Sequence, residues 1–305
     1  MIWTDYESKI DHINLPLLTE KKIQLSILRE DLIHSEISGN KYRKLKYNIL
    51  HALELGYTKI LTFGGAFSNH IAATAAAANL NNLEVIGCIR GEEVEELIDQ
   101  NSTLSFAKNQ GMKFKFLSRE AYRSKDSTEF LNQLKLDFPD YYIIPEGGTN
   151  ELAIKGCEEI LYEDCKHYDF VACAIGTAGT ISGVINKSTD KQNILGFSAL
   201  KGDFIEDEIQ KLTKKRNFTI FANYHFGGYG KITDELIEFI NIFKYQTSIQ
   251  LDPIYTGKMI FGLMDLIEKD YFKPNSKILA IHTGGIQGIQ GINKLLVKKN
   301  KPIIQ

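Results

Sequence analysis

The segment Ser38–Tyr47 (SGNKYRKLKY) contains a lysine whose position favours covalent chemistry. Gly39 allows a close backbone approach, and Asn40 is a good N-cap for the helical pattern that follows. Lys41 would then lie at a helix N-terminus, where the positive end of the helix dipole disfavours another cation and favours the neutral amine. A neutral amine on a flexible side chain is the nucleophile that Schiff-base chemistry requires.

The same segment can also be interpreted as a run of solvated charges. Lys41, Arg43, Lys44 and Lys46 would then form an exposed basic face of the helix, as short charge runs usually do. The segment alone does not decide between the two interpretations for Lys41. For Arg43, Lys44 and Lys46 we expect the solvated face in either case.

Apolar runs typical of buried strands alternate with helical patterns along the whole chain. The expected strands are 23–27, 59–63, 85–89, 114–116, 141–144, 170–175, 194–198, 218–221 and 278–281. The expected helices are 45–53, 69–78, 94–98 with an extension toward 106, 129–138, one from 151, one after 180, 205–212, 236–243, 259–267 and 289–296.

This alternation predicts an α/β fold with two lobes, each a mostly parallel twisted sheet wrapped by helices. A chain of 305 residues is long for one compact unit, and it contains no low-complexity linker. The chain would therefore cross between lobes at ordinary loops near Lys44 and Asn150. We expect a larger domain made of residues 1–44 plus 151–305 and a smaller domain made of residues 45–150.

Composition excludes several classes of partner. A formal net charge of −2 gives no reason to expect nucleic acid or an anionic membrane surface. The four cysteines (Cys88, Cys157, Cys165, Cys173) form no CxxC pair and no metal-ligand spacing, so we expect no metal site and reduced, structural thiols in a cytoplasmic protein. The first residues do not resemble a signal peptide, and no apolar run approaches the length of a membrane span.

Three expected strands run into a glycine-containing turn that is followed by a helix. The turns are Gly64–Asn69, Gly176–Thr180 and His282–Gly285. Ligands of parallel α/β sheets bind at the carboxyl ends of strands, so all three turns point toward possible binding crevices. For a single such turn, close packing of helix on strand would be the simpler explanation.

The turn Gly176–Thr180 (GTAGT) is the most informative of the three. Its backbone amides, the following helix N-terminus and the hydroxyls of Thr177 and Thr180 suit a phosphate group. It is not a Walker A loop, because no Gly-Lys-Ser/Thr ends it, and the spacing to Gly183 does not match a dinucleotide fingerprint. A phosphate site and an amine nucleophile together indicate pyridoxal 5′-phosphate, which carries both a phosphate and an aldehyde.

From about Arg29 to about Gln290 the chain resembles the 1-aminocyclopropane-1-carboxylate (ACC) deaminase and D-cysteine desulfhydrase family of fold type II pyridoxal-phosphate enzymes. Seven motifs in the family's order carry this resemblance: Arg29–Leu32, Ser38–Lys41 with Arg43–Leu45, Ser68–His70, Gly147–Asn150, Gly176–Thr180, Leu251–Lys258 and His282–Gly285. The resemblance implies a tryptophan-synthase-β-like fold whose larger domain binds the cofactor. It also implies a small amino-acid substrate, a homodimer, and a deaminating enzyme of the lyase or hydrolase class.

The resemblance also implies roles for individual residues. Lys41 matches the lysine that binds the cofactor covalently and moves protons, and Asn69 matches a residue that contacts the cofactor's phenolic oxygen. Ser68, Asn69, His70 and Thr256 are implied at the substrate, and Tyr255 and Tyr229 beside the reacting centre. The phosphate cup would be Gly176, Thr177, Ala178, Gly179 and Thr180, and Thr283 would face the pyridine nitrogen. Tyr255 as a core aromatic and Thr283 as an N-cap are the structural alternatives.

Two positions favour desulfhydrase over deaminase activity. Thr256 and Thr283 stand where the deaminase-type pattern has Glu and Leu. A neutral hydroxyl at the pyridine nitrogen draws less negative charge into the ring than a carboxylate does, which favours prompt loss of a good β-leaving group. We therefore expect β-elimination from an amino acid such as D-cysteine, giving pyruvate, ammonia and sulfide, rather than opening of a cyclopropane.

Two departures from the family pattern leave other functions open. Phe67 and Ala72 replace a Gln and an Arg that the family often has, and an apolar Phe67 would narrow the pocket or suit a different amino acid. The alternatives are an ACC deaminase, a protein of the same fold that binds the cofactor without such turnover, and a nucleotide binder that uses the same glycine turns.

Overall fold

The computed structural model describes residues 3–202 and 204–305; Met1 and Ile2, at the start of the expected larger domain, and Asp203 lie outside the described residues. Two sheets organise the chain. The six-stranded sheet has the order β1 (Ile10–Ile13), β2 (Gln24–Leu28), β10 (Lys277–Ile281), β7 (Phe170–Ile175), β8 (Asn193–Ser198) and β9 (Phe218–Phe221). The four-stranded sheet has the order β5 (Lys113–Leu117), β4 (Glu84–Arg90), β3 (Lys59–Gly64) and β6 (Tyr142–Ile144).

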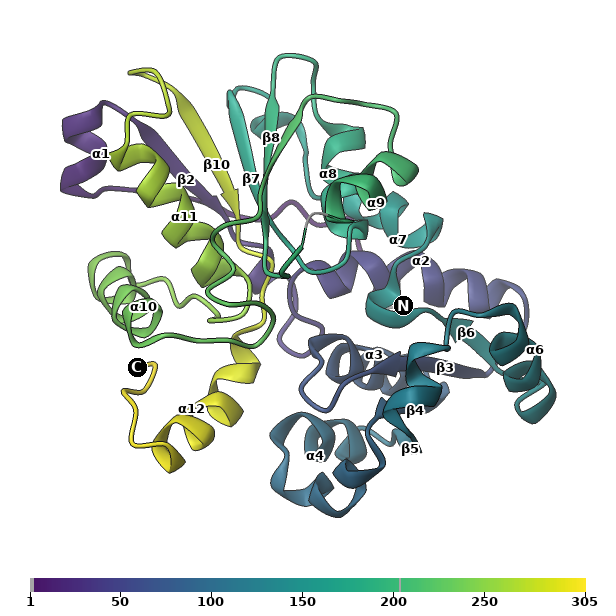
Figure 1. Ribbon diagram of the computed structural model, residues 1–305. Coiled ribbons are helices and arrows are strands. Elements are labelled where there is room, and N and C mark those ends of the chain that lie inside the picture. Colours follow the sequence, from purple (N-terminus) through teal and green to yellow (C-terminus); the bar gives the residue numbers. More distant parts are fainter. Residues whose placement is uncertain (1–2, 203) are drawn as a thin grey trace.

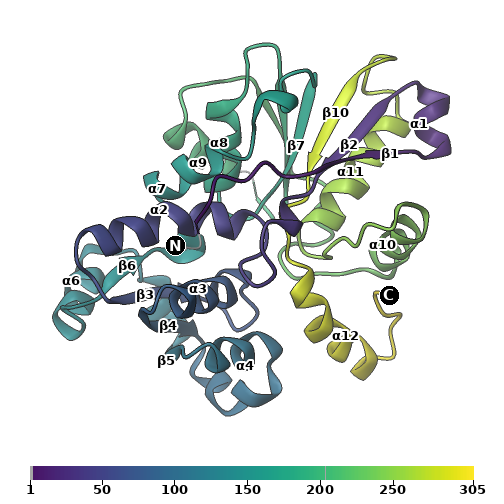
Figure 2. The same ribbon diagram turned by 180° about the vertical axis from the view of Figure 1, so that it is seen from behind.

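All strand pairs in both sheets are parallel except the pair β1–β2, which is antiparallel at the edge of the larger sheet. The predicted α/β architecture of mostly parallel sheets wrapped by helices is therefore confirmed. Figure 1 and the view from behind in Figure 2 show α2 (Asn40–Glu54) running between the two sheets. The other helices are α1 (Pro16–Lys21), α3 (Asn69–Leu80), α4 (Ser102–Asn109), α5 (Arg119–Arg123), α6 (Thr128–Asp137), α7 (Glu151–Glu158), α8 (Gly179–Lys187), α9 (Phe204–Leu212), α10 (Asp234–Thr247), α11 (Thr256–Glu268) and α12 (Ile289–Lys298).

The central strands β10, β7 and β8 of the larger sheet are buried on both faces, which explains their nearly continuous apolar sequences. Along β7, Val171, Cys173 and Ile175 face one core with residues of α8, while Ala172 and Ala174 face a second core with residues of α10 and α11. All four cysteines are buried free thiols, and burial raises the pKa of Cys173 to about 12, as befits structural residues. No helix in the described ranges is both long and apolar enough to cross a membrane.

The expected helix from 94 toward 106 is wrong. The structure has a 3₁₀ segment, Glu92–Gln100, and then a separate helix α4, because Asn101 accepts hydrogen bonds from the amides of Thr103 and Leu104 at 3.0 Å and caps the new helix. The strand β1 and the short helices α1 and α5 were not expected, since they are too short to show a clear period.

Candidate active site

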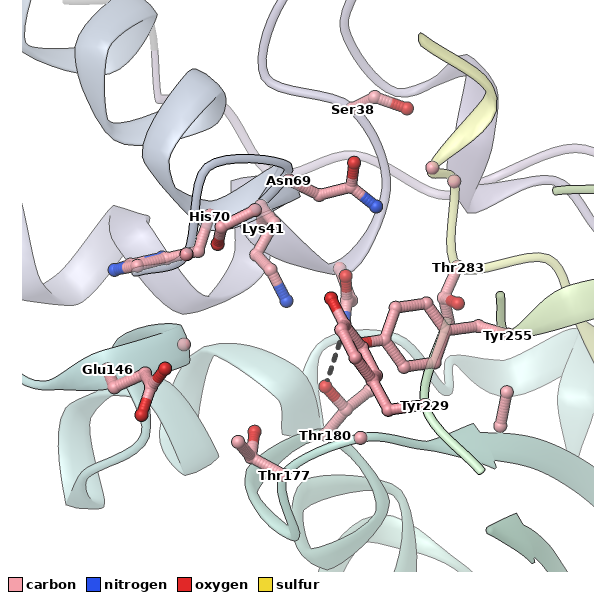
Figure 3. Close-up of a pocket in the computed structure, with 18 of the residues that line it drawn as sticks. Ser38, Lys41, Asn69, His70, Glu146, Thr177, Thr180, Tyr229, Tyr255 and Thr283 are labelled. Carbon is pink, nitrogen blue, oxygen red and sulfur yellow. Dashed lines mark hydrogen bonds between the residues drawn. The ribbon is translucent and has the colours of Figure 1, made fainter. Parts of the chain in front are cut away.

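A pocket of about 360 Å³ lies where the carboxyl ends of the strands meet, and all three glycine turns border it. Gly65, Gly176 and Gly285 line it, one from each turn. Figure 3 shows Lys41, Asn69, Thr177, Tyr229, Tyr255 and Thr283 converging there from different elements. The predicted site residues that line the pocket are Lys41, Ser68, Asn69, His70, Gly176, Thr177, Thr180, Tyr229, Tyr255 and Thr283.

Gly39 places Lys41 against the third glycine turn. Its φ of 64° is in the left-handed region, and a Cβ there would come within 1.9 Å of the Thr283 carbonyl oxygen, so only glycine fits. The predicted N-cap at Asn40 is wrong: α2 begins at Asn40 and Gly39 occupies the cap position. The Asn40 side chain instead donates to Thr180 Oγ1 at 2.7 Å, because this hydroxyl on α8 faces the start of α2.

The amine of Lys41 is prepared to react as a nucleophile. Loss of solvation in the pocket, followed by the neighbouring charge of Lys44, lowers the pKa of Lys41 to about 7. The predicted lowering of the Lys41 pKa is confirmed. Its main cause is desolvation, whereas the helix dipole was the expected cause. At neutral pH a large fraction of the Lys41 side chain is therefore the unprotonated amine.

Lys44 contacts the phosphate turn Gly176–Thr180 through Thr177, outside the pocket lining. Its ammonium donates to the carbonyl of Gly147 at 3.1 Å and to the hydroxyls of Thr149 and Thr177 at 3.0 Å each. The residue is fully buried, burial lowers its pKa, and no carboxylate within the described residues lies at ion-pair distance from it. A buried ammonium whose hydrogen-bond partners are all neutral would be stabilised by an anion bound next to it.

These observations test whether the turn suits a phosphate. Gly179 begins α8, whose first amides have no intrahelical acceptor and whose dipole favours an anion. A Cβ at Gly179 would lie 3.1 Å from Lys44 Nζ and 2.9 Å from the Thr149 methyl, so the glycine keeps this corner open. Ala178 and Gly179 belong to the same turn, although the pocket wall itself is formed by Gly176, Thr177 and Thr180. The residues present therefore fit the phosphate of pyridoxal 5′-phosphate.

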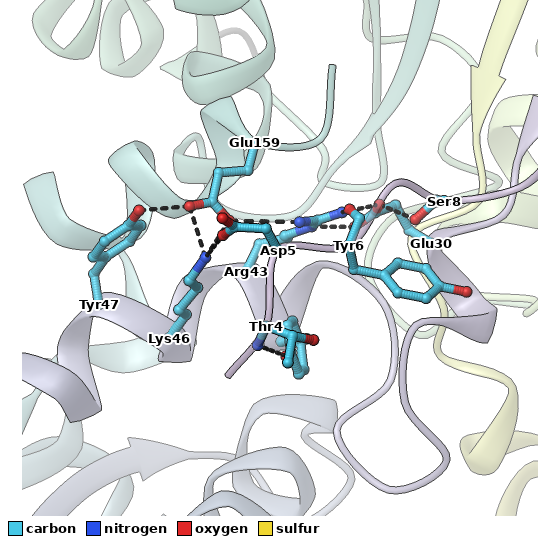
Figure 4. A network of polar contacts seen from close by, with 10 residues as sticks. Thr4, Asp5, Tyr6, Ser8, Glu30, Arg43, Lys46, Tyr47 and Glu159 are labelled. Carbon is cyan, nitrogen blue, oxygen red and sulfur yellow. Dashed lines mark hydrogen bonds and ion pairs between the residues drawn. The ribbon is translucent and has the colours of Figure 1, made fainter. Parts of the chain in front are cut away.

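The expected solvated face of Arg43, Lys44 and Lys46 is wrong, because all three side chains are buried. Arg43 donates to both carboxylate oxygens of Glu30 at 2.9 and 3.0 Å, and Lys46 pairs with Glu159 at 2.9 Å. Figure 4 shows the network, in which Asp5, Tyr6 and Ser8 of the N-terminal segment close over α2. These charged side chains can be buried because segments distant in the sequence supply carboxylate and carbonyl partners for them.

Replacing Glu159 by Gln removes the negative charge that pairs with Lys46 and should lower the free energy of unfolding. We expect a loss of only about 1 kcal/mol, because this carboxylate is partly exposed to water. Its side chain is 24% exposed, and it receives hydrogen bonds from Lys46 and Tyr47. Denaturant unfolding of the purified protein would measure the change. The matched control is Glu163→Gln, which removes one partner of the exposed ion pair Lys166–Glu163. Equal stability of the two variants would contradict a role for the network.

Two tyrosines lie side by side in the wall of the pocket. The rings of Tyr229 and Tyr255 lie 6.1 Å apart between centroids and are tilted by 58°. Desolvation and the proximity of Tyr229 raise the pKa of Tyr255 well above 10, so it remains a proton donor. A Cβ at Gly176 would come within 2.7 Å of the Tyr255 ring, which explains the glycine at this position.

The structure does not bring Thr256 into the pocket. Thr256 is fully buried, and both its hydroxyl and its amide donate to Asp252 Oδ1, at 2.7 and 2.8 Å. The other oxygen of Asp252 accepts from the amides of Ile254 and Tyr255. Thr256 thus braces the turn that presents Tyr255 and makes no contact with the cavity.

Ser68, Asn69 and His70 form the start of α3 and one wall of the pocket. Asn69 Oδ1 accepts from Gln287 Nε2 at 3.2 Å, which orients its amide. His70 is buried, and burial followed by the nearby lysines lowers its pKa well below 6.5. His70 Nε2 lies 2.7 Å from Thr62 Oγ1, whose own proton goes to the Ile144 carbonyl, so Nε2 carries the proton of a neutral imidazole.

Sequence reasoning missed three residues at or beside the pocket. Arg90 and Glu146 line it. Arg90 is the last residue of β4 and Glu146 lies two residues after β6, so their positions at carboxyl ends were a usable signal. Lys44 was missed although it lies three residues after Lys41, on the same helix face. Phe67 does not line the pocket; it is about half exposed and points toward Gly291 of α12, so the expected narrowing of the pocket is not found.

Comparison with known proteins agrees with this geometry. The family model described as "Pyridoxal-phosphate dependent enzyme" matches residues 12–284. An Arabidopsis thaliana mitochondrial protein named as a bifunctional D-cysteine desulfhydrase/1-aminocyclopropane-1-carboxylate deaminase is 32% identical, over 90% of this chain and 75% of its own.

Solved structures show the same fold. A crystal structure described as an ACC deaminase homologue is 30% identical, with a TM-score of 0.80 over 96% of this chain and 94% of its own. A hydrogen sulfide-producing enzyme of Fusobacterium nucleatum has a TM-score of 0.66 at 15% identity, over 94% of this chain and 98% of its own, and shows the fold alone.

These matches confirm a fold type II enzyme that uses pyridoxal phosphate and belongs to the lyases and deaminases. The expected hydrolase class is wrong, since the relatives' names describe a desulfhydrase and a deaminase acting with this cofactor. The chain belongs to the pyridoxal-phosphate dependent enzymes and, within them, to the ACC deaminase and D-cysteine desulfhydrase family.

Proposed function

We propose that this enzyme catalyses β-elimination from a small amino acid, with D-cysteine as the first candidate. The observation that carries the proposal is the partly neutral amine of Lys41, which shares one pocket with a phosphate-binding turn and a pair of protonated tyrosines. The overall reaction would convert D-cysteine and water to pyruvate, ammonia and hydrogen sulfide. Pyridoxal 5′-phosphate, when bound, supplies an aldehyde that joins amines and a conjugated ring that stabilises negative charge at the α-carbon.

The residues of the chain would divide the remaining work. Thr177, Thr180, the amides of the turn and Lys44 would hold the phosphate, and Thr283 and Asn69 would contact the ring. The amides at the start of α3 and the hydroxyl of Ser68 would bind the substrate carboxylate. His70, neutral and fixed by Thr62, would shape this wall.

Lys41 and the tyrosine pair would move the protons. Lys41 Nζ would accept the α-proton of the substrate, because its pKa of about 7 leaves the amine free to do so near neutrality. A hydroxyl of Tyr255 or Tyr229 would then give a proton to the departing sulfur, since Tyr255 stays protonated in this pocket. The neutral hydroxyl of Thr283 at the ring would favour prompt loss of a leaving group over a long-lived carbanion.

A substrate screen tests the proposal. The purified holoenzyme should form pyruvate, ammonia and sulfide from D-cysteine, faster than it forms 2-oxobutanoate and ammonia from ACC. L-Cysteine and D-serine complete the panel and report stereochemistry and leaving group. Formation of 2-oxobutanoate from ACC without elimination from cysteine would instead assign the deaminase activity, which the name of the Arabidopsis relative also carries.

Three further expectations are part of the proposal. The enzyme would be a homodimer located in the cytoplasm, as the family resemblance and the four buried thiols suggest. Residues 1–44 plus 151–305 would form the larger, cofactor-binding domain, and residues 45–150 the smaller one. The division of the strands between the two sheets supports this grouping of segments. The expected crossing at a loop near Lys44 is wrong, because Lys44 lies inside the helix α2.

A further inference from the structure

Lys258 is a buried lysine that has no part in the reaction described above. It lies in the first turn of α11, three residues after Tyr255, and its side chain is 2% exposed. Its ammonium donates to the carbonyls of His225 at 2.9 Å and Gly228 at 3.0 Å. No carboxylate in the described part of the chain lies within ion-pair distance of it, so these two carbonyls are its polar partners.

The backbone of the segment His225–Gly230 makes few hydrogen bonds of its own, although the Phe226 ring packs against Phe261 of α11. Gly227, Gly228 and Gly230 all have positive φ, as does Phe226 at 54°. Left-handed conformations are unfavourable for a non-glycine residue, and glycine loops are entropically costly to order. Two backbone turns and one bond from the Gly227 amide to His225 Nδ1 are the local hydrogen bonds that hold it.

Lys258 joins this segment to the element that carries the other tyrosine. Gly228 immediately precedes Tyr229, and Tyr255 occupies the cap position of α11, one helical turn before Lys258. The hydrogen bond from Lys258 to Gly228 therefore spans the two chain segments that present the tyrosines. Figure 3 shows the two rings side by side at the pocket, although they come from separate parts of the chain.

We propose that Lys258 is a positioning residue that holds the segment His225–Gly230 against α11 and so fixes Tyr229 beside Tyr255. Its kinetic consequence rests on the proposed function, whereas the anchoring of the segment does not. A methionine at this position would fill similar space without donating. Each carbonyl would keep only its backbone donor, the Gly228 amide or the Lys231 amide, and the hydrogen bonds that tie the segment to α11 would be lost. Misplacing a catalytic group by about 1 Å can cost 10²-fold in rate.

The first test measures anchoring directly in the cofactor-loaded protein. In Lys258→Met, hydrogen exchange of the amides of Gly228 and Lys231 should be at least about tenfold faster than in the wild type. The matched control is Lys214→Met, which removes an exposed lysine outside this segment and should leave exchange unchanged. Unchanged exchange in Lys258→Met would overturn the proposal. If that variant does not fold, Lys258→Gln, which can still donate to one carbonyl, should show an intermediate increase.

The second test asks whether Lys258 acts through Tyr229. Lys258→Met and Tyr229→Phe should each lower kcat about 10–100-fold with little change in KM, and the double variant should be no slower than the slower single variant. Losses that multiply would overturn the proposal. If the wild type shows no elimination with any substrate, the proposed function fails, and the exchange experiment still decides whether Lys258 anchors the segment.

Discussion

Lys41→Ala should abolish elimination, lowering kcat by at least about 10³-fold, and should remove the visible absorption band of the bound cofactor. The side chain of Lys41 lines the pocket, and no other pocket-lining residue in the described part of the chain carries an amine. Without it neither covalent attachment of the cofactor nor removal of the α-proton has a suitable group. Absorption spectroscopy and a pyruvate assay measure the two losses separately.

The control for this variant is Lys187→Ala, since Lys187 is an exposed lysine at the end of α8 and far along the helix from the phosphate turn. The control should keep both the band and the activity. The pKa of about 7 for Lys41 adds a pH dependence: the rate at which the cofactor-free protein takes up pyridoxal phosphate covalently should rise through pH 7 and level off above it. A band that survives in Lys41→Ala would assign the attachment to another residue.

Lys44→Met should weaken cofactor binding about 10–100-fold, because a hydrogen bond to a charged group contributes roughly 1.5–3 kcal/mol. Lys44 is the only described cation that bonds to the phosphate turn, through Thr177. Equilibrium binding of pyridoxal phosphate, followed by the growth of the visible band, would measure the loss. At saturating cofactor the variant should regain most of its activity, since Lys41 is still present.

Two further observations separate charge from packing at Lys44. Thr177→Val removes one neutral hydroxyl from the same corner and should weaken cofactor binding less than Lys44→Met does. Inorganic phosphate should raise the melting temperature of the cofactor-free wild type and have a smaller effect on Lys44→Met. Equal stabilisation of both by phosphate would show that Lys44 does not supply the counter-charge.

The sequence by itself determined the architecture and the place of the site. The run 170–175 is apolar at every position, which in this alternating pattern indicates a parallel strand buried on both faces, and β7 is such a strand. The glycine turns follow strands directly, so their convergence at carboxyl ends could be deduced without coordinates. Lys41 could be identified because its segment and the phosphate turn are both motifs of one recognisable family.

Only the tertiary structure decided which charges are buried and which residues support others. Lys44 and Arg43 looked like a surface run because their partners, Thr177 on one side and Glu30 on the other, are contributed by distant parts of the chain. Thr256 and Lys258 belong to a motif that resembled a substrate site. In the structure Thr256 donates to Asp252, and Lys258 donates to the segment His225–Gly230. Local patterns report propensity and period, whereas burial of a charge depends on non-local partners that offset its desolvation, and these become visible only in the folded chain.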